Sequence, residues 1–433
     1  MSGNDLRELM GRYGTGADQT GEARRPRRWT IAAVILAVAV LAGVALSLVV
    51  WRRSRRAPDA ETSAKASDSA RGQRLASLVG YAYTWSPDGK WIAYFAPSAQ
   101  DNNPTLWRVR PDGKGRRRIP AEMSLPYRLG GDASRARIGL SWGPHGTQLA
   151  CGPALPLSGR AWTVDLDSRL TWDLGVQYAA PPHWSPDGRE LAFVHRGFDR
   201  ANRRVSLALL LVSADGDQER EIGRTYSWPP RQVQSGPGWA PDGKRIIVPW
   251  DRAPVTGSPA AEQVPVVDAW LIDRDGSNPH PLVAAWDYQF PSDGDRRIHC
   301  EYTHQCWSPD GEHVVVAAFD EADRWRSLGL FRVSITTRRA EPLLPETVRR
   351  QCLSADDAPR CPTWSPQGGR IAFAAAGRLC VLAVQDARCQ SINTGHQVLN
   401  APPLWSPDGK RILYAAPAAS GQGTDLCLVT VHK

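Results

Sequence analysis

The chain has 433 residues, of which 42% are hydrophobic, and its 18 Trp allow a large core, which excludes disorder for most of it. The formal net charge is +9, but eight Arg flank one apolar segment and residues 57–433 carry only +3. A domain so close to neutrality does not carry the strong positive charge that is typical of DNA- and RNA-binding proteins. We therefore expect no nucleic-acid partner.

The first predicted element is a membrane helix over residues 30–51, between a short tail (1–29) and a flexible polar stalk (52–73). Residues 30–50 form an uncharged run of 21 positions, TIAAVILAVAVLAGVALSLVV. A helix of that length spans the hydrocarbon core, and Trp29 and Trp51 are placed as interfacial anchors. A buried soluble helix and a cleavable signal peptide are the alternatives. The flanking Arg and the long leader favour an uncleaved signal anchor.

The predicted orientation of this helix rests on the cysteines. Four Arg flank the helix on each side, so the positive-inside rule favours neither orientation. Six of the eight Cys form close pairs in the sequence: Cys300/Cys306, Cys352/Cys361 and Cys380/Cys389. None has CxxC spacing, and an even count with close pairs indicates disulfides in an oxidising compartment. The alternative is buried thiols. We expect a single-pass protein of the cell membrane with its tail cytoplasmic and residues 57–433 extracytoplasmic.

One pattern recurs seven times after the stalk. Its segments read WSPDGKWIAY, WGPHGTQLAC, WSPDGRELAF, WAPDGKRIIV, WSPDGEHVVV, WSPQGGRIAF and WSPDGKRILY. They begin at Trp85, Trp142, Trp184, Trp239, Trp307, Trp364 and Trp405. The spacing of 41 to 68 residues is typical of four-stranded propeller blades with variable loops. The predicted fold is therefore all-β, a seven-bladed β-propeller over residues 74–433, preceded by a single transmembrane helix.

The motif itself predicts a hairpin turn. Pro sets φ for a tight turn, Asp accepts hydrogen bonds from nearby amides, and Gly takes the positive φ that closes the turn. Each blade then reads strand A, WSPDG turn, strand B, loop, strand C, turn, strand D. The seventh repeat has no strand D, and Arg74–Val79 resembles the missing element, so we expect the first strand to close the ring.

The repeated motif, followed by a strand and a second turn, resembles the TolB-type, WD40-like propeller repeats of bacterial exported proteins. The resemblance covers about residues 74–433 and implies a propeller that binds proteins or ligands. TolB has an additional α/β domain and is a soluble periplasmic protein, so its particular partner does not transfer. A similar pattern occurs in the propellers of prolyl-oligopeptidase-like peptidases.

Binding is expected on the face that carries the B–C and D–A loops, because the A–B and C–D turns are short and repetitive. Long irregular loops occur at 224–238, at 284–306 and in the insert 251–265, which is expected between strands B and C. Exposed aromatic rings beside Arg predict a protein or glycan contact formed by Tyr226, Trp228, Arg231, Trp286, Tyr288, Phe290, Arg296 and Tyr302. The alternative is that these rings pack under their own loops.

Catalytic and metal sites are not predicted. Four His lie in predicted D–A segments, His183, His299, His304 and His396, but HxxxH and HExxH spacings do not occur. Residues 273–280 resemble a calcium loop without its final Glu and are expected to form a C–D turn. No metal, no cofactor and no catalytic residue is expected.

The functional expectation is a membrane-anchored, extracytoplasmic propeller that serves as a protein- or ligand-binding module of the bacterial cell envelope and is not an enzyme. One alternative is an envelope enzyme of the glycan lyase or hydrolase type, with its site in the propeller channel. The other is a sensor that signals through the membrane helix. The sequence carries no signal for an oligomeric state.

Overall fold

The computed structural model describes residues 72–78, 81–98, 104–119, 138–153, 160–177, 182–199, 204–227, 236–250, 266–287, 297–321, 323–346, 357–421 and 423–432. All of them belong to one of the chain's two compact units, Ser69–Lys433. The predicted membrane helix (30–51) and tail lie outside these residues. Within the ranges given, no helix is long and apolar enough to cross a membrane.

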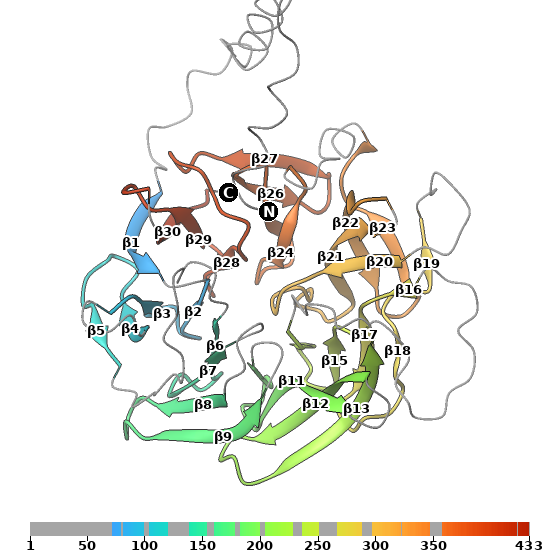
Figure 1. Cartoon of the computed structure of the whole chain (residues 1–433). Coiled ribbons are helices and arrows are strands. Elements are labelled where there is room, and N and C mark those ends of the chain that lie inside the picture. Colours follow the sequence, from blue (N-terminus) through green and yellow to red (C-terminus); the bar gives the residue numbers. More distant parts are fainter. Residues whose placement is uncertain are drawn as a thin grey trace, which may run out of the picture. The chain divides into compact units, whose positions relative to one another are not determined.

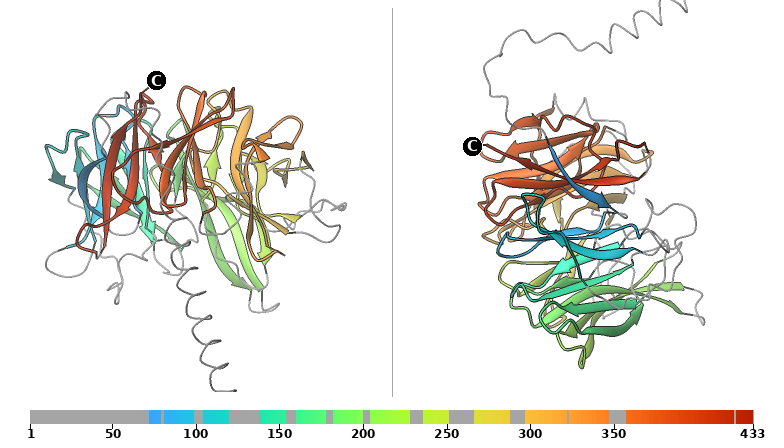
Figure 2. Two further views of the ribbon diagram at one scale, coloured as in Figure 1. Left: turned by 90° about the horizontal axis from the view of Figure 1, so that it is seen from above. Right: turned by 90° about the vertical axis from the view of Figure 1, so that its left-hand side faces the viewer.

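The described residues form an all-β, seven-bladed propeller, as predicted. Seven sheets follow one another in chain order round a ring (Figure 1). Seen from the side, the sheets stand next to each other around the ring axis (Figure 2). The innermost strands of neighbouring blades contact each other. Apolar side chains from adjacent sheets fill the space between them, for example Val194 and Leu209 of blade 3 with Trp239 and Ile246 of blade 4.

The first four blades are four-stranded and antiparallel. Blade 1 contains β2 (Tyr83–Trp85), β3 (Ile92–Ala96), β4 (Thr105–Val109) and β5 (Arg117–Arg118). Blade 2 contains β6 (Ile138–Trp142), β7 (Gln148–Pro153), β8 (Arg160–Asp165) and β9 (Thr171–Gln177). Blade 3 contains β10 (His183–Trp184), β11 (Glu190–Asp199), β12 (Arg204–Ser213) and β13 (Glu219–Ser227). Blade 4 contains β14 (Gly238–Trp239), β15 (Arg245–Val248), β17 (Trp270–Asp273) and β18 (His280–Pro281).

Blade 5 is enlarged and blade 7 combines both ends of the propeller. Blade 5 contains β16 (Val266–Val267), β20 (Arg297–Glu301), β21 (His313–Asp320), β22 (Arg326–Ser334), β23 (Arg339–Pro342) and β19 (Ala285–Trp286). Blade 6 contains β24 (Arg360–Trp364), β25 (Arg370–Ala375), β26 (Arg378–Ala383) and β27 (Arg388–Ile392). Blade 7 contains β28 (Leu404–Trp405), β29 (Arg411–Pro417), β30 (Thr424–Thr430) and β1 (Gln73–Leu78).

The WSPDG turn forms as the sequence predicts, with one addition. In blade 1 the Asp88 carboxylate accepts the Lys90 N–H at 3.0 Å, and Gly89 has a φ of +67°. The Ser86 hydroxyl, whose role the sequence analysis did not assign, donates to Asp88 at 2.6 Å and accepts the Trp91 N–H at 2.9 Å. The same Ser–Asp contact recurs in blades 3, 5 and 7. The motif is therefore a self-contained polar turn.

The motif Trp joins one blade to the blade before it. Trp239 Nε1–H donates to the His183 carbonyl at 3.1 Å, and that acceptor directly precedes the motif Trp of blade 3. The equivalent bonds run from blade 5 to 4, from blade 7 to 6 and from blade 1 to 7. In blade 6 the indole instead donates to Gly368 of its own turn. These bonds fix the spacing of the innermost strands.

The first strand closes the ring, as predicted. Strand β1 pairs antiparallel with β30, from Gln73 opposite Leu428 to Leu78 opposite Thr424. The strand begins at Gln73, one residue before the predicted start of the propeller. Arg74 donates to the buried Asp425 carboxylate at 2.7 Å. Pairing covers the edge of β30 that would otherwise be exposed.

Hydrogen bonding by the motif Trp gives a stability test. Trp239 and Trp184 are both 7% exposed, but Trp184 Nε1 has no hydrogen-bond partner among the described residues. Trp239→Phe should therefore cost about 1–3 kcal/mol more than Trp184→Phe, because it leaves a buried carbonyl without its donor. Urea unfolding of the two variants measures the difference. Equal losses would show that the indole bond does not hold the blades together.

Candidate functional site

The candidate site lies at the loop-face end of the inner strands of blades 5 and 6. The insert after β15 does join strands B and C of blade 4, as predicted. The two residues that follow the insert form β16, which pairs in parallel with β20 of the next blade, with Val266 opposite Arg297 and Val267 opposite Ile298. This added strand brings Asp268 beside His299, which is 31 residues away in the sequence.

The buried His299 and the partly buried Asp268 form an ion pair at the centre of the site. His299 Nδ1–H donates to Asp268 Oδ2, and the Cys300 N–H donates to the other carboxylate oxygen at 2.7 Å. His299 is 8% exposed, and its Nε2 has no hydrogen-bond partner among the described residues. Burial lowers the pKa of His299. The charge and hydrogen bond of Asp268, together with the charges of Glu301 and Glu321, raise it by more than burial lowers it, so the pKa lies above its usual value.

A second ion pair lies two residues along β20. Glu301, 5% exposed, accepts Arg360 Nη1 at 2.8 Å and the Cys361 N–H at 2.8 Å. Cys361 has a φ of +51°, where the pairing of β24 with β25 shifts its register between Arg360 and Thr363. The Arg360 guanidinium also lies 4.3 Å from the centre of the Phe319 ring. The bulge thus directs an Arg of blade 6 onto blade 5.

An exposed Trp completes the site. Trp325 lies in the hairpin between β21 and β22, is 43% exposed, and meets the His299 ring edge-on at 5.2 Å. Arg324 and Trp325 have φ values of +52° and +62°, so both take a backbone conformation that favours Gly or Asn. Such strain in residues that bury little apolar surface is a feature of binding sites. Asp268, His299, Glu301, Glu321, Trp325 and Arg360 are called the His299 site below.

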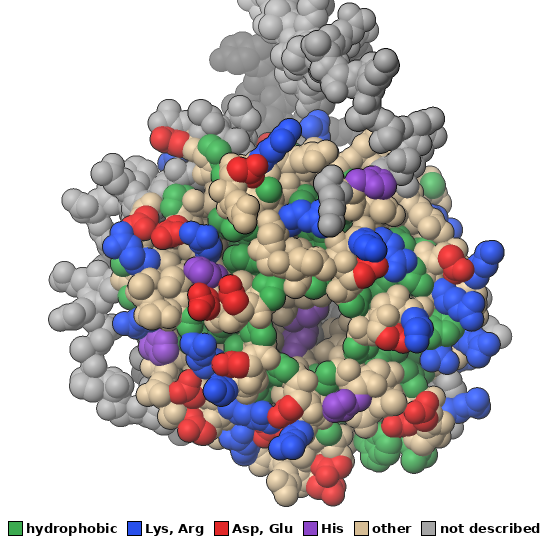
Figure 3. Space-filling model, turned by 180° about the vertical axis from the view of Figure 1, so that it is seen from behind, with side chains coloured by type: hydrophobic (Ala, Val, Ile, Leu, Met, Phe, Trp, Pro, Cys, Tyr) green, Lys and Arg blue, Asp and Glu red, His purple; other side chains and the backbone are tan. Residues whose placement is uncertain are grey.

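A second group of His lies in the central channel. The His183 and His304 rings stack at 4.8 Å with an interplanar angle of 19°. Burial lowers the pKa of His304 to about 4 and that of His183 well below its usual value, so both are neutral at pH 7. Figure 3 shows histidine side chains at the bottom of a central hollow. Two stacked neutral rings make this a packed channel wall.

The channel segment is an insertion in blade 5 between β20 and Trp307. The Trp364 N–H donates to the Gln305 carbonyl at 2.7 Å, and the Gln305 side chain accepts the Trp405 N–H at 3.3 Å. Thr303 donates to the Pro362 carbonyl at 3.0 Å. The insertion therefore connects blade 5 with blades 6 and 7, and its role is structural.

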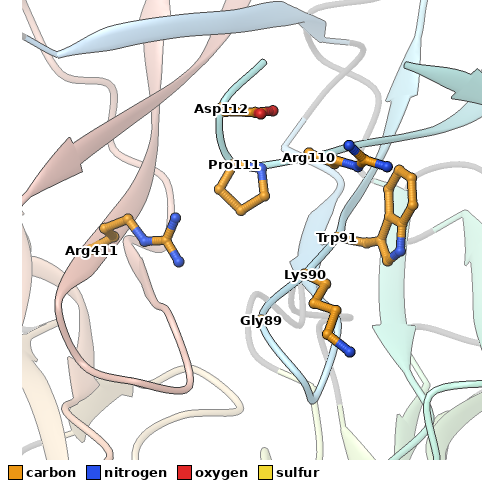
Figure 4. Close-up of a pocket in the computed structure, with 7 residues that line it drawn as sticks. All are labelled: Gly89, Lys90, Trp91, Arg110, Pro111, Asp112 and Arg411. Carbon is orange, nitrogen blue, oxygen red and sulfur yellow. The ribbon is translucent and has the colours of Figure 1, made fainter. Parts of the chain in front are cut away.

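A pocket of about 500 Å³ lies on the opposite face, at the seam between blades 7 and 1 (Figure 4). Its lining is Gly89, Lys90, Trp91, Arg110, Pro111, Asp112 and Arg411. Arg110 lies 5.5 Å from the Trp91 ring, Arg411 lies 5.3 Å from the Trp85 ring, and Lys90 pairs with Asp88. The cations thus make contacts within the repeated turns, and the pocket is a weaker candidate than the His299 site.

Solved structures of other propellers resemble this chain. An oligogalacturonate lyase in complex with manganese has 13% identity and a TM-score of 0.55, with 84% of this chain and 97% of that chain covered. The propeller domain of Myceliophteria thermophila Cps50 (Swd1) has 12% identity and a TM-score of 0.51, with 84% and 100% covered. The chain shares their fold. TolB from Acinetobacter baumannii aligns with 13% identity and a TM-score of 0.39, over 79% and 64%.

No family model matches the sequence, and no curated protein matches it. At such low identity the solved structures establish the β-propeller fold and nothing about the ligand. The site must therefore be argued from its own residues.

Only three of the eight residues predicted for binding are described in the structure. Five lie outside the described residues: Trp228, Arg231, Tyr288, Phe290 and Arg296. Tyr226 is in β13, opposite Ser206. The exposure expected of the other two is wrong: Tyr302 is 3% exposed in the core, and the partly buried Trp286 meets Phe331 edge-on at 4.9 Å. These two rings pack under their own segments, because β19 and the channel insertion hold them against blade 5.

The structure shows no disulfide among the described cysteines, so the pairs Cys300/Cys306 and Cys380/Cys389 stay predictions. Cys300, Cys306, Cys380 and Cys389 are not joined in disulfides. Cys300 stays opposite Ala318, whereas the turn from Thr303 carries Cys306 against Gly238 of blade 4. Cys389 lies opposite Leu382 with Cys380 as its diagonal neighbour, and a side-chain hydrogen bond with Cys380 lowers the pKa of Cys389. Cys352 lies outside the described residues, so a bridge to Cys361 stays a prediction.

Two sequence motifs have structural explanations. Gly139–Gly143 (GLSWG) matches the G-x-S-x-G pattern of serine hydrolases, but Ser141 is paired with Ala150 inside a propeller blade rather than placed at a strand-to-helix turn. Residues 273–280 form the C–D turn of blade 4, as predicted, with Asn278 donating to the Asp273 carboxylate at 2.6 Å.

His396, predicted near the channel, hydrogen-bonds the Tyr414 hydroxyl at 2.9 Å.

The His299–Asp268 pair predicts a pH effect. Because the folded-state pKa is raised above 6.5, protonated His299 stabilises the fold below pH 6.5, and this contribution is lost as the pH rises through the folded-state pKa. Asp268→Asn should lower the pKa of His299, because it removes the negative charge that offsets the effect of burial. NMR titration of the imidazole measures this pKa, with Asp310→Asn as the control. An unchanged pKa in Asp268→Asn would contradict the assignment.

Proposed function

We propose that this protein is a membrane-anchored binding module of the bacterial cell envelope, whose protein or glycan ligand docks at the His299 site. The anchor rests on the uncharged segment 30–50 between Arg clusters. The extracytoplasmic location rests on the resemblance of the repeats to those of exported propellers. Its ligand site lies where loops are longest, on a rigid ring.

The observation that carries this proposal is the exposed Trp325. Only four large hydrophobic residues among those described are exposed: Tyr81, Leu170, Trp172 and Trp325. Trp325 alone among them contacts the His299–Asp268 pair. An aromatic face beside carboxylates and Arg360 suits stacking plus hydrogen bonding of a ligand.

Capture of the partner tests this proposal. The full-length chain in detergent, cross-linked to envelope extract, should retain a partner that Trp325→Ala loses by at least about tenfold, as expected for loss of a binding hot spot. Trp172→Ala, which removes a similarly exposed ring from blade 2, is the matched control and should retain the partner. If Trp325→Ala captured the same partner at the same yield, the site would lie elsewhere.

An enzyme is the second candidate, and the His299–Asp268 pair favours it. A carboxylate that holds Nδ1–H leaves Nε2 as the nitrogen that can accept a proton, which is the arrangement of a general base. Catalysis on this fold is compatible with the lyase that it resembles.

Turnover assays test the enzyme candidate. The full-length chain is assayed on oligogalacturonates, the substrate in that lyase's name, and on peptides. His299→Gln should abolish any turnover, whereas His304→Gln, in the channel wall, should keep it. Absence of turnover on both substrate classes would leave the binding module as the function.

A further inference from the structure

Three residues of the His299 site are placed to share one ligand. Asp268, His299 and Glu321 each bring a possible ligand atom within 4.8 Å of the other two. We propose that they bind a divalent cation of the Mn²⁺ or Zn²⁺ type. This inference rests on the ligand site proposed above, to which the cation would contribute a charge.

Backbone hydrogen bonds to β20 hold the groups on either side of His299 in place. Asp268 follows β16, whose only pairing is with β20, and the Asp268 N–H donates to the Ile298 carbonyl at 3.4 Å. His299 is within β20. The Glu321 N–H donates to the Arg297 carbonyl at 3.1 Å, so the end of β21 stays next to β20. Three segments that are far apart in the sequence therefore meet at one point. The formation of a single turn does not explain this arrangement.

The chemistry of the groups suits a cation. An imidazole with two carboxylates is a donor set for Mn²⁺, Zn²⁺ and related ions. His299 is 8% exposed. Because its Nδ1 lies against Asp268 Oδ2, a cation shared with Asp268 would take the place of the Nδ1 proton. The charges of Asp268, Glu301 and Glu321 all act on the same imidazole.

A cation there would also serve the proposed ligand site. Three protein ligands leave coordination positions for water or for an oxygen of the bound molecule. Trp325 lies against the His299 ring, so a ligand stacked on the indole would be next to the cation. The carboxylates and hydroxyls of glycans are oxygen ligands of the kind that such ions accept.

A second cluster in the same blade provides an internal control. Asp310, Glu312 and His313 also bring ligand atoms within 4.8 Å of one another. Asp310 and Glu312 are exposed, and the Asp310 carboxylate already accepts the Ser308 hydroxyl at 2.5 Å and the Glu312 N–H at 2.9 Å. This cluster is a WSPDG turn, and it carries no proposal.

Direct metal titration tests the inference without the unidentified ligand. Mn²⁺ is added to the metal-free full-length chain in detergent, and free Mn²⁺ is measured by electron paramagnetic resonance. We expect one Mn²⁺ per chain. Glu321→Gln should weaken binding by about tenfold or more, and Glu312→Gln should bind as the unchanged chain does. His299→Gln should abolish binding, and circular dichroism reports whether it folds.

The outcomes separate this inference from the proposed function. Absence of Mn²⁺ and Zn²⁺ binding by the unchanged chain, or equal affinity in Glu321→Gln and Glu312→Gln, would overturn the cation site. Because Glu321→Gln changes a side chain at the end of a strand, it tests the site even if His299→Gln does not fold. Partner capture by Trp325→Ala is measured separately, so either proposal can fail while the other stands.

Discussion

The indole hydrogen bond between neighbouring blades is the interaction on which this fold depends. Each such bond links the carbonyl before one motif Trp to the next motif Trp, so the repeat encodes the spacing of the ring as well as the turn. Arg side chains reinforce it: Arg245, Arg370 and Arg411 each lie over the motif Trp of the following blade, at 5.0–6.0 Å. Four of the seven motif indoles make this bond, and the bond from Trp85 to the Leu404 carbonyl joins blade 1 to blade 7.

Blade 5 departs from the repeat where the candidate site is found. Its inner strand ends early at Glu301, a segment from blade 4 is added beside it, and the indole of blade 6 no longer bonds across the seam. The bulge in β24 moves Arg360 onto this irregular blade. The regular blades supply rigidity, and the irregular one supplies a buried acid, an imidazole and an exposed ring in one place.

The sequence predicted the regular features because they are local. Seven copies of one turn predicted the blades, the strand order and the closing strand. The His299 site depends on contacts that no local pattern records: Asp268 reaches His299 through a parallel pairing between blades, and Trp325 occupies a turn without the Gly or Asn that marks such turns. Aromatic residues in loops were read as exposed, yet Tyr302 is in the core, because the composition of a loop does not reveal which side of it faces the protein.

The pairing of β1 with β30 has a consequence for how the protein is made. Gln73 leaves the ribosome well before its partner Leu428, which lies 355 residues later in the sequence (428 − 73). At typical elongation rates the closing strand waits roughly 20 to 70 s for its neighbour. During that time six blades can form one after another from contacts close in sequence, while the ring stays open. Closure is then a late, long-range step that fixes all seven blades together, and a chain without β30 would leave the edges of β1 and β29 exposed.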